Sequence, residues 1–365
     1  MKTLGDMPKE TESTRQIGSH DAVYPNRFHT AGPPNLPPPN WRDLLQSHWD
    51  EDGPRRALMA CFVQAVYLLE LDRQQNRSDN SSLAPYWWLQ FRYKLVRTLF
   101  DDRDGSIFGT LLEWDRSNAM SSFIVVRPAG LPKAVLALRG TILKSPTILR
   151  DFEDDFRFLI QENLKGSRRF SVTLDLLRSV IIRHGSSKVC IAGHSLGAGF
   201  ALQVGKALAK EGIYVDAHLF NPPAISLARG LGDMKEKAAR VVWKKLRLII
   251  PSSSKNESDG TSPVSKDKNR YPQGKKQWVP NSYVNDQGYI CCRYIDPERK
   301  ASKGSVAAAR LFVRSKGKQK FMEAHGLQQW WSNEDNKELA LQSSELINKQ
   351  LRSLYNSSPQ KKNFK

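Results

Sequence analysis

The sequence predicts an α/β protein with a mostly parallel central sheet that is covered by helices on both faces. Short apolar runs alternate along the chain with longer segments in which apolar residues recur at helical spacing. Two of the short runs, at Lys133–Thr141 and Lys188–Ala192, do not alternate with polar residues, which indicates strands that are buried on both faces, as in a parallel sheet. The elements that carry this prediction are Lys133–Thr141, Phe170–His184, Lys188–Ala192, Ala198–Gly212 and Val215–Pro223.

Extra helices and a strand pair are expected before this alternating region. Apolar residues recur at helical spacing in Arg55–Gln74, and Ala84–Leu99 reads as a second helix with an aromatic stripe. The stripe is interpreted as core packing rather than as a cofactor site. Ser106–Trp114 and Ser121–Pro128 then read as two strands around a polar turn.

The domain organisation follows from composition. The chain has 365 residues, of which 39% are hydrophobic, and this is enough for a sizeable core. Residues 1–54 are predicted to be disordered, and their proline-rich stretch at 31–41 is interpreted as a linker rather than as a ligand for SH3-type domains. One domain is expected over residues 55–355, interrupted by a disordered basic insert at 252–276. Residues 356–365 form a basic tail.

The cysteines fit a reducing compartment. Cys61, Cys190, Cys291 and Cys292 form no CxxC pair, which argues against a disulfide framework and against a zinc site. No signal peptide, transit peptide or membrane-spanning stretch is visible, so a cytoplasmic protein is expected. The acidic run Glu153–Asp155 is interpreted as a solvated helix start, and neither a metal nor a cofactor is predicted.

The positive charge is concentrated in the C-terminal half. The formal net charge is +19, and residues 229–276, 291–320 and 355–365 carry +8, +7 and +3 of it. The first of these segments begins with a predicted basic helix at Leu227–Ile250. No nucleic-acid-binding module accompanies the charge, so nucleic acid is not expected as a partner. A basic face suits peripheral contact with an anionic membrane, and solubility is the alternative reading.

The most informative motif lies between a predicted buried strand and a helix. Gly193-His194-Ser195-Leu196-Gly197 is a G-x-S-x-G in the strand–turn–helix context that a nucleophile elbow requires. The glycines let neighbouring backbone approach closely, and Ser195 is then held in a strained position above the sheet. The N–H of Leu196 and the positive end of the following helix would face an oxyanion formed on a substrate acyl group.

A serine nucleophile needs a base, and two histidines follow Ser195 in the sequence. His218 lies inside a predicted strand and is interpreted as structural. His325 comes after a later strand-like run and before the last helix, where the catalytic histidine is expected when the triad follows the order serine, acid, histidine. His325 is therefore the predicted base.

The chain resembles the class 3, or fungal-type, lipases of the α/β-hydrolase fold. The motifs that carry this likeness are ALRGT, IAGHSLGAGFAL, the strand ending in FNPP, and the spacing from His325 to Trp330. A plant branch of that family, often labelled "GDSL esterase/lipase", is similar over a fuller set: VQAVYLLELDRQ, WWLQFRYKL, SIFGTLLEW, FNPPAISLA, YVNDQGYICCRY and AHGLQQWW. That branch lacks a Gly-Asp-Ser-Leu block, as does this chain. The resemblance spans residues 55–355 and implies hydrolysis of a carboxylic ester, with a lipid ester as the expected substrate.

The resemblance also implies roles for single residues. Ser195 would be the nucleophile, His325 the general base, and the Leu196 N–H one half of the oxyanion hole. The other half would come from Thr141, which follows Arg139-Gly140 as in the R-G-S/T turn of the family. Residues 142–150 would match the lid of the family, and an ordinary connection between strand and helix is the alternative.

The orienting acid is the point at which this sequence departs from the family. The family places an aspartate in a V-N-x-x-D pattern, and Gly288 occupies that position here. Asp286 is the nearest acid and the predicted replacement, since only its geometry around His325 matters. Asp296, in an Asp-Pro turn, is a weaker candidate.

Two functions follow from these observations. The first is a serine esterase or lipase that acts on acylglycerol-type lipid esters through a Ser-His-Asp acyl-enzyme mechanism. The second is a catalytically weak or inactive lipase-like protein that serves as a lipid-binding, signalling or scaffold module. The intact elbow favours the first function and Gly288 favours the second. The sequence carries no indication of the oligomeric state.

Overall fold

A computed structural model describes the parts of the chain on which the following rests. These parts are residues 51–78, 81–121, 126–142, 167–223, 277–288, 291, 294–295, 310–315, 317–319, 321–331, 339–342 and 351. Predicted disordered residues 1–50 and 252–276, the basic helix, the tail and Asp296 lie outside these ranges, as does the predicted lid apart from Ile142. The prediction of disorder is wrong for residues 52–54, which form the first turn of a helix.

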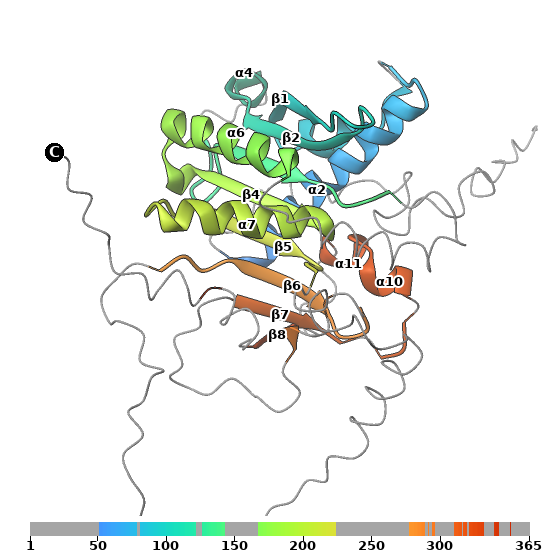
Figure 1. The fold of residues 1–365 in the computed structure, drawn as a ribbon. Coiled ribbons are helices and arrows are strands. Elements are labelled where there is room, and N and C mark those ends of the chain that lie inside the picture. The colour runs from blue at the N-terminus through green and yellow to red at the C-terminus, as the bar shows by residue number, and fades with distance from the viewer. Residues whose placement is uncertain are drawn as a thin grey trace, which may run out of the picture.

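One sheet of eight strands runs through the described residues, and its strands lie side by side in sequence order (Figure 1). Neighbouring strands from β3 to β7 are parallel, whereas β1, β2 and β8 are added antiparallel at the two edges. The predicted mostly parallel sheet is therefore confirmed. The strands are β1 (Tyr93–Phe100), β2 (Ile107–Trp114), β3 (Ala134–Leu138), β4 (Val189–His194), β5 (Asp216–Phe220), β6 (Asn281–Asn285), β7 (Arg310–Arg314) and β8 (Leu339–Gln342).

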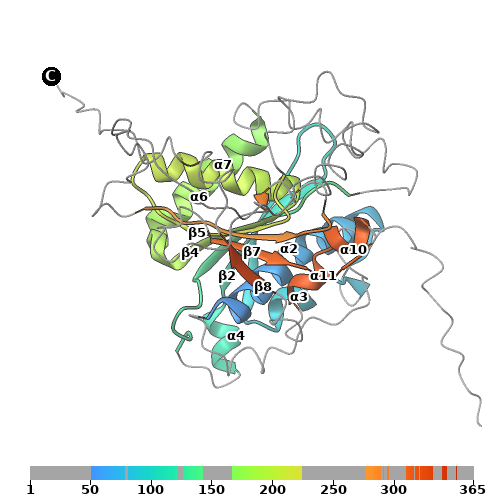
Figure 2. The same cartoon turned by 90° about the horizontal axis from the view of Figure 1, so that it is seen from below.

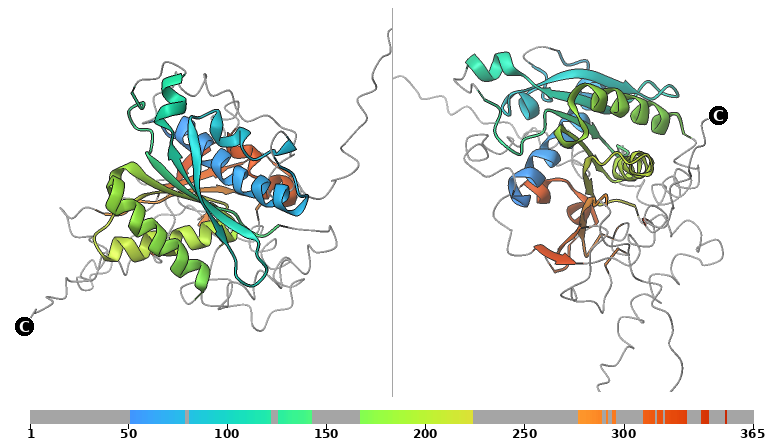
Figure 3. Two further views of the ribbon diagram at one scale, coloured as in Figure 1. Left: turned by 90° about the horizontal axis from the view of Figure 1, so that it is seen from above. Right: turned by 90° about the vertical axis from the view of Figure 1, so that its left-hand side faces the viewer.

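Helices cover both faces of the sheet (Figures 2 and 3). On one face lie α6 (Arg168–His184) and α7 (Leu196–Lys210), and on the other lie α2 (Asp52–Gln74), α3 (Tyr86–Leu89) and α11 (Gln328–Trp331). Two buried clusters result, because successive residues of a strand point to opposite faces. On β4, for example, Ile191 packs in the cluster of α6 and α7, while Cys190 and Ala192 pack in the cluster of α2. The predicted helices on both faces are confirmed.

The register brings the carboxyl ends of the parallel strands to one edge. Leu138 of β3 pairs with Gly193 of β4, and His194 pairs with Phe220 of β5. The segments that follow these strands therefore emerge beside one another, which is where open α/β sheets place their ligand sites. Ser195 joins the end of β4 to the start of α7 at this edge.

Helix α2 is almost entirely buried because it has neighbours on two sides. It packs on strands β2 to β5 and is covered in turn by α3 and α11. Its side chains are buried without interruption from Arg56 to Leu68, as expected for a helix that is apolar around most of its circumference. The predicted helix is confirmed, and it begins at Asp52, three residues before the predicted start.

The predicted helix at Ala84–Leu99 is wrong. Only the four residues of α3 are α-helical, and β1 then pairs antiparallel with β2 along its whole length. The helical run ends before Arg92, whose φ of 61° is left-handed. Pairing with β2 thus overrides the local pattern, which had suggested an aromatic helix.

The predicted strand at Ser121–Pro128 is also not found in its described part. Ser121 ends the short helix α4 (Arg116–Ser121), and residues 126–128 belong to no strand. Asp115 starts α4, since its Oδ1 accepts the N–H groups of Ser117 at 3.1 Å and Asn118 at 3.3 Å. Strand β2 pairs with β1 and β3 instead.

Shorter elements complete the fold. A 3₁₀ turn, η3 (Ser186–Lys188), precedes β4, and α10 (Phe321–His325) precedes α11. Among the helices of the described ranges, none is both long enough and apolar enough to cross a lipid bilayer.

Candidate active site

Ser195 occupies a strained turn between β4 and α7. Its φ of 54° and ψ of −124° place a residue with a side chain in a region that such residues rarely adopt. The Ser195 N–H donates to the carbonyl of Phe220 at 2.9 Å, which fixes the turn against the end of β5. The side chain is 2% exposed and stands at the N-terminal end of α7. These are the features that the G-x-S-x-G pattern predicts for a nucleophile elbow.

The two glycines of the motif are explained by close backbone contacts. A Cβ at Gly193 would lie 2.4 Å from the carbonyl oxygen of Gly197, and a Cβ at Gly197 would lie 2.6 Å from the carbonyl oxygen of Arg139. Neither position has room for a side chain. The start of α7 therefore packs directly against the end of β3, and this contact brings the segment after β3 to the elbow.

The turn that contains Thr141 lies against Ser195. A Cβ at Gly140 would be 2.8 Å from the Cβ of Ser195. Arg139 holds this turn, because its Nη1 donates to the carbonyl of Gly140 at 2.6 Å. The described peptide bonds are trans, so the N–H of the half-buried Thr141 points away from that carbonyl. The structure therefore brings the predicted oxyanion residue next to the predicted nucleophile.

His325 ends helix α10 and is connected to the elbow through its backbone. The Nε2 atom of His194 lies 2.8 Å from the carbonyl oxygen of His325, and the centroids of the two rings are 4.7 Å apart. Burial, together with the nearby ring of His194, lowers the pKa of His325 well below its ordinary value. The imidazole is thus neutral at pH 7, the form that can accept a proton.

Gln329 fixes the loop on both sides of His325. Its Nε2 donates to the carbonyls of Ala324 at 2.8 Å and Gly326 at 2.9 Å. Its Oε1 accepts from the Nδ2 of Asn285, at the end of β6, at 2.7 Å. The histidine loop is therefore tied to the sheet edge. Neither Gln329 nor Asn285 is part of a recognisable motif, and the bond that joins them spans 44 positions of the sequence.

Asp286 and Gly288 differ in burial and in the groups that surround them. Asp286 is half-buried after β6, and its Oδ1 accepts from the Nε2 of Gln287 at 3.1 Å. Gly288 is buried, and a Cβ there would lie 3.8 Å from the carbonyl oxygen of Ala324 and 2.9 Å from the Sγ of Cys291. The position at which the family carries its acid therefore borders the histidine loop in this protein, and Cys291 fills the space that an acidic side chain would need.

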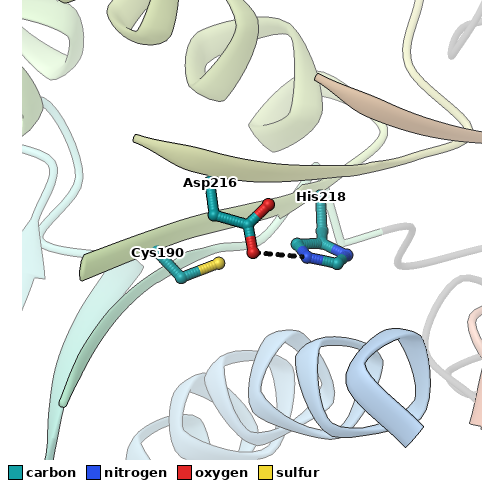
Figure 4. A group of neighbouring side chains, drawn as sticks. All are labelled: Cys190, Asp216 and His218. Atoms are coloured by element: carbon teal, nitrogen blue, oxygen red, sulfur yellow. Dashed lines mark hydrogen bonds and ion pairs between the residues drawn. The ribbon is translucent and has the colours of Figure 1, made fainter. Parts of the chain in front are cut away.

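His218 lies in a separate polar group beneath α2. Figure 4 shows Cys190, Asp216 and His218 projecting from β4 and β5 toward that helix. Their potential ligand atoms lie within 4.8 Å of one another. Asp216 is also 3.3 Å from the Nη1 of Arg55, while the Nδ1 of His218 is 2.9 Å from the hydroxyl of Tyr283.

The chemistry of this group favours a structural role over metal binding. Burial and the adjacent Asp216 raise the pKa of the Cys190 thiol well above its ordinary value, so the thiolate that a metal requires is disfavoured. The guanidinium of Arg55 already neutralises the carboxylate of Asp216. The group therefore joins α2, β5 and β6 through hydrogen bonds and ion pairs, which agrees with the structural interpretation of His218.

The sequence of this chain is similar to that of a known plant protein. No family model matches the chain. A curated protein of Arabidopsis thaliana named GDSL esterase/lipase is 29% identical over an alignment of 330 residues, which covers 80% of this chain and 93% of the relative. The chain resembles a plant esterase/lipase. The resemblance to the esterase/lipase branch that the sequence motifs indicate is thus confirmed.

A solved fungal lipase is also similar. The lipase from Rhizopus microsporus var. chinensis matches 72% of this chain and 74% of its own, with 10% identity and a TM-score of 0.30. The fold assignment itself rests on the strand order and register of this chain and on the turn at Ser195.

Proposed function

We propose that this protein is a serine carboxylic ester hydrolase, an esterase or lipase, with Ser195 as its nucleophile. The observation that carries the proposal is the backbone of Ser195, which is held at a φ of 54° in the turn between a buried strand and a helix. Strain of this kind persists where the surrounding structure enforces it, and it is typical of catalytic sites. The name of the plant relative supports the same class of reaction.

The proposed reaction has two halves. The Oγ of Ser195 attacks the acyl carbonyl while His325 takes the hydroxyl proton, and the N–H groups of Leu196 and Thr141 stabilise the oxyanion. His325 then protonates the departing alcohol, which leaves an acyl-enzyme. A water molecule that loses a proton to His325 attacks this ester. His325 returns the proton to the Oγ of Ser195 as the bond to the acyl group breaks, which releases the carboxylic acid and free Ser195. Asp286 is proposed to orient His325.

The proposed substrate is a lipid ester of the acylglycerol type. This part rests on the resemblance to class 3 lipases, which also assigns a lid to residues 142–150. Ser195 is 2% exposed, so a substrate must displace neighbouring groups before it reaches the hydroxyl. A lid that opens at a lipid surface would meet this requirement.

Labelling with a fluorophosphonate probe tests the proposal. The probe reacts with activated serines, so the wild-type protein should be labelled and Ser195→Ala should not. Ser282→Ala is the matched control, because Ser282 is a buried serine in β6, which β5 separates from β4, and its loss should leave labelling unchanged. The wild-type protein and Ser282→Ala should hydrolyse a short-chain p-nitrophenyl ester, and Ser195→Ala should not. A wild-type protein that neither reacts with the probe nor hydrolyses the ester would refute the proposed function.

A second candidate function is favoured by Gly288. If no carboxylate orients His325, the same fold would bind lipid esters and turn them over slowly or not at all. The support for this alternative is that Gly288 and Cys291 occupy the place of the family's acid. Binding of a fluorescent lipid without fluorophosphonate labelling would favour this alternative.

A further inference from the structure

Tyr67 of helix α2 reaches the candidate active site from beneath the sheet. Its side chain is 3% exposed, and its hydroxyl lies 2.8 Å from the backbone nitrogen of Gly140 and 2.8 Å from the Nδ1 of His194. Gly140 precedes the proposed oxyanion residue, and His194 precedes the proposed nucleophile. One hydroxyl on a helix therefore contacts two of the segments that must be aligned for catalysis.

The direction of each hydrogen bond follows from counting donors. The Gly140 N–H can only donate, so the oxygen of Tyr67 accepts that bond and its single proton goes to the Nδ1 of His194. His194 must then carry its own proton on Nε2, which donates to the carbonyl of His325 at 2.8 Å. Both ring nitrogens of His194 are thus engaged, which prevents it from acting as the general base.

The protonation states support this arrangement. Burial lowers the pKa of His194 to about 4, so its ring is neutral at pH 7 and has one nitrogen available as an acceptor. Burial raises the pKa of Tyr67, so the phenol keeps the proton that it donates. The bonds are therefore maintained throughout the neutral range.

The chain of bonds ends at the backbone of His325. The carbonyl of His325 accepts a second bond, from the Nδ2 of Asn221, at 2.8 Å. Asn221 follows β5 directly, and its own N–H donates to the carbonyl of Tyr283 at 2.8 Å. The turn after β3, the elbow, the end of β5 and the histidine loop are thus connected by consecutive hydrogen bonds, with Tyr67 at one end and Asn221 at the other.

We propose that Tyr67 is a positioning residue that sets the oxyanion turn and the His325 loop relative to Ser195. This inference rests on the function proposed above. The hydroxyl fixes the peptide that precedes the Gly140–Thr141 peptide, and through His194 it fixes the carbonyl of His325. A displacement of about 1 Å among reacting groups lowers catalytic rates by about 100-fold, so such a tether affects turnover without touching the substrate.

Tyr67→Phe tests the proposal, with Tyr93→Phe as the matched control. Tyr93 is a fully buried tyrosine at the start of β1 whose hydroxyl donates to the carbonyl of Pro132, and β2 and β3 separate β1 from β4, which leads to Ser195. We expect Tyr67→Phe to lower kcat on a p-nitrophenyl ester by roughly 10- to 100-fold with KM within about twofold. The control should lose stability to a comparable extent and keep its kcat. A folded Tyr67→Phe protein with the kcat of the wild type would overturn the inference.

A second measurement is made on the wild-type protein and so does not depend on whether Tyr67→Phe folds. Nitrogen-15 spectra of the histidine rings in the wild-type protein report which nitrogen carries the proton, and the signal of His194 is identified by its loss in His194→Gln. The inference requires the neutral Nε2–H form at pH 7, and the Nδ1–H form would overturn it. Wild-type protein without Ser195-dependent labelling would overturn the proposed function and this inference with it, whereas active wild type with an equally active Tyr67→Phe would overturn this inference alone.

Discussion

Asp286 is the proposed acid of the catalytic triad, and its carboxylate would orient His325. Asp286→Asn should lower kcat for ester hydrolysis by up to about 10⁴-fold, the loss seen in serine proteases when the orienting acid is removed. The reason is that the neutral amide no longer stabilises the imidazolium of His325 as it forms. Steady-state kinetics with a soluble short-chain ester, at saturating and low substrate, measure the effect.

Glu323→Gln is the control for this change. Glu323 is an exposed acid in α10, two residues before His325, so the variant removes the same charge close to the same loop. Its kcat should stay within a few-fold of the wild-type value. Equal turnover in Asp286→Asn and the wild-type protein would remove Asp286 from the triad and shift attention to other acids or to a Ser-His pair.

A site residue could be predicted from the sequence when the pattern that marks it lies in a short stretch of the chain. Ser195 and its two glycines form one contiguous motif, and His325 was predicted as the base from its place in the chain order. Tyr67 and Asn221 gave no such signal. Tyr67 lies in an apolar helix and reads as a core residue, and its partner His194 is 127 positions away. Only the folded sheet brings such residues together.

The contact between helix α7 and Trp278 yields a prediction at the scale of elements. Gly205 faces this ring, and a Cβ there would lie 2.2 Å from Cζ2 of Trp278. Gly205→Ala gains about 1 kcal/mol of helix propensity but overpacks a buried contact, which costs about 1–3 kcal/mol, so a net loss of stability is expected. Urea unfolding followed by circular dichroism gives the difference in unfolding free energy.

Trp278→Phe tests whether the contact with Trp278 causes the loss of stability in Gly205→Ala. The smaller ring relieves the clash, although it loses the bond from the indole N–H to the carbonyl of Val215 at 2.7 Å. The double variant should therefore be more stable than the sum of the two single losses implies, by at least about 0.5 kcal/mol. Additive losses would show that Gly205 is not limited by this contact.

The elements were predicted well where one pattern dominates and poorly where two compete. Strand β3 is an uninterrupted apolar run, β4 begins with one, and α6 and α7 have a clear helical period, so their type followed from the sequence. Strand β5 contains Asp216 and His218 and was predicted from its position between a helix and two prolines. Between residues 84 and 99, aromatic residues suit either a helix or a strand. The choice was made by pairing with β2 and by the left-handed backbone of Arg92, neither of which is visible in a local window.

The stability of the whole molecule should fall as the pH decreases from 6.5 toward 4. Burial lowers the pKa of His194 to about 4, whereas in the unfolded chain it titrates near 6.5. Between these values the unfolded state binds more protons than the folded state, so unfolding becomes easier as the pH falls. At pH 5 this amounts to about 2 kcal/mol for His194, and His325 acts in the same direction.

Urea unfolding at pH 8, 7 and 5 measures this dependence. The free energy of unfolding should be nearly constant between pH 8 and 7 and lower at pH 5. Carboxylates whose pKa values are lowered, such as Asp101 beside Arg103 and Arg169, lose their contribution only below about pH 4 and so do not account for this window. Equal stability at pH 7 and pH 5 would contradict the neutral, buried state of both rings.

The uneven distribution of charge gives a second prediction for the whole molecule. Residues outside the three basic C-terminal segments carry only +1 of the +19, so the segment containing the elbow is nearly neutral. We expect Lys235→Glu, Arg240→Glu and Lys244→Glu together to weaken binding to phosphatidylserine vesicles. At about 1 kcal/mol for each basic residue, the loss is about 3 kcal/mol, or roughly 100-fold in the partition coefficient.

The control for this triple variant reverses three basic residues outside the three basic C-terminal segments. Arg97, Lys133 and Lys210 are exposed in the described structure and lie outside the basic segments, so their joint reversal to glutamate alters the net charge equally. If only the total charge matters, both triple variants will lose vesicle binding alike. If the basic segments form the contact, the control will bind like the wild type. Hydrolysis of a soluble ester should be unchanged in both variants, because neither substitution touches the hydrogen bonds around Ser195. Vesicle binding that survives reversal of the basic segment would show that the charge has no part in lipid contact.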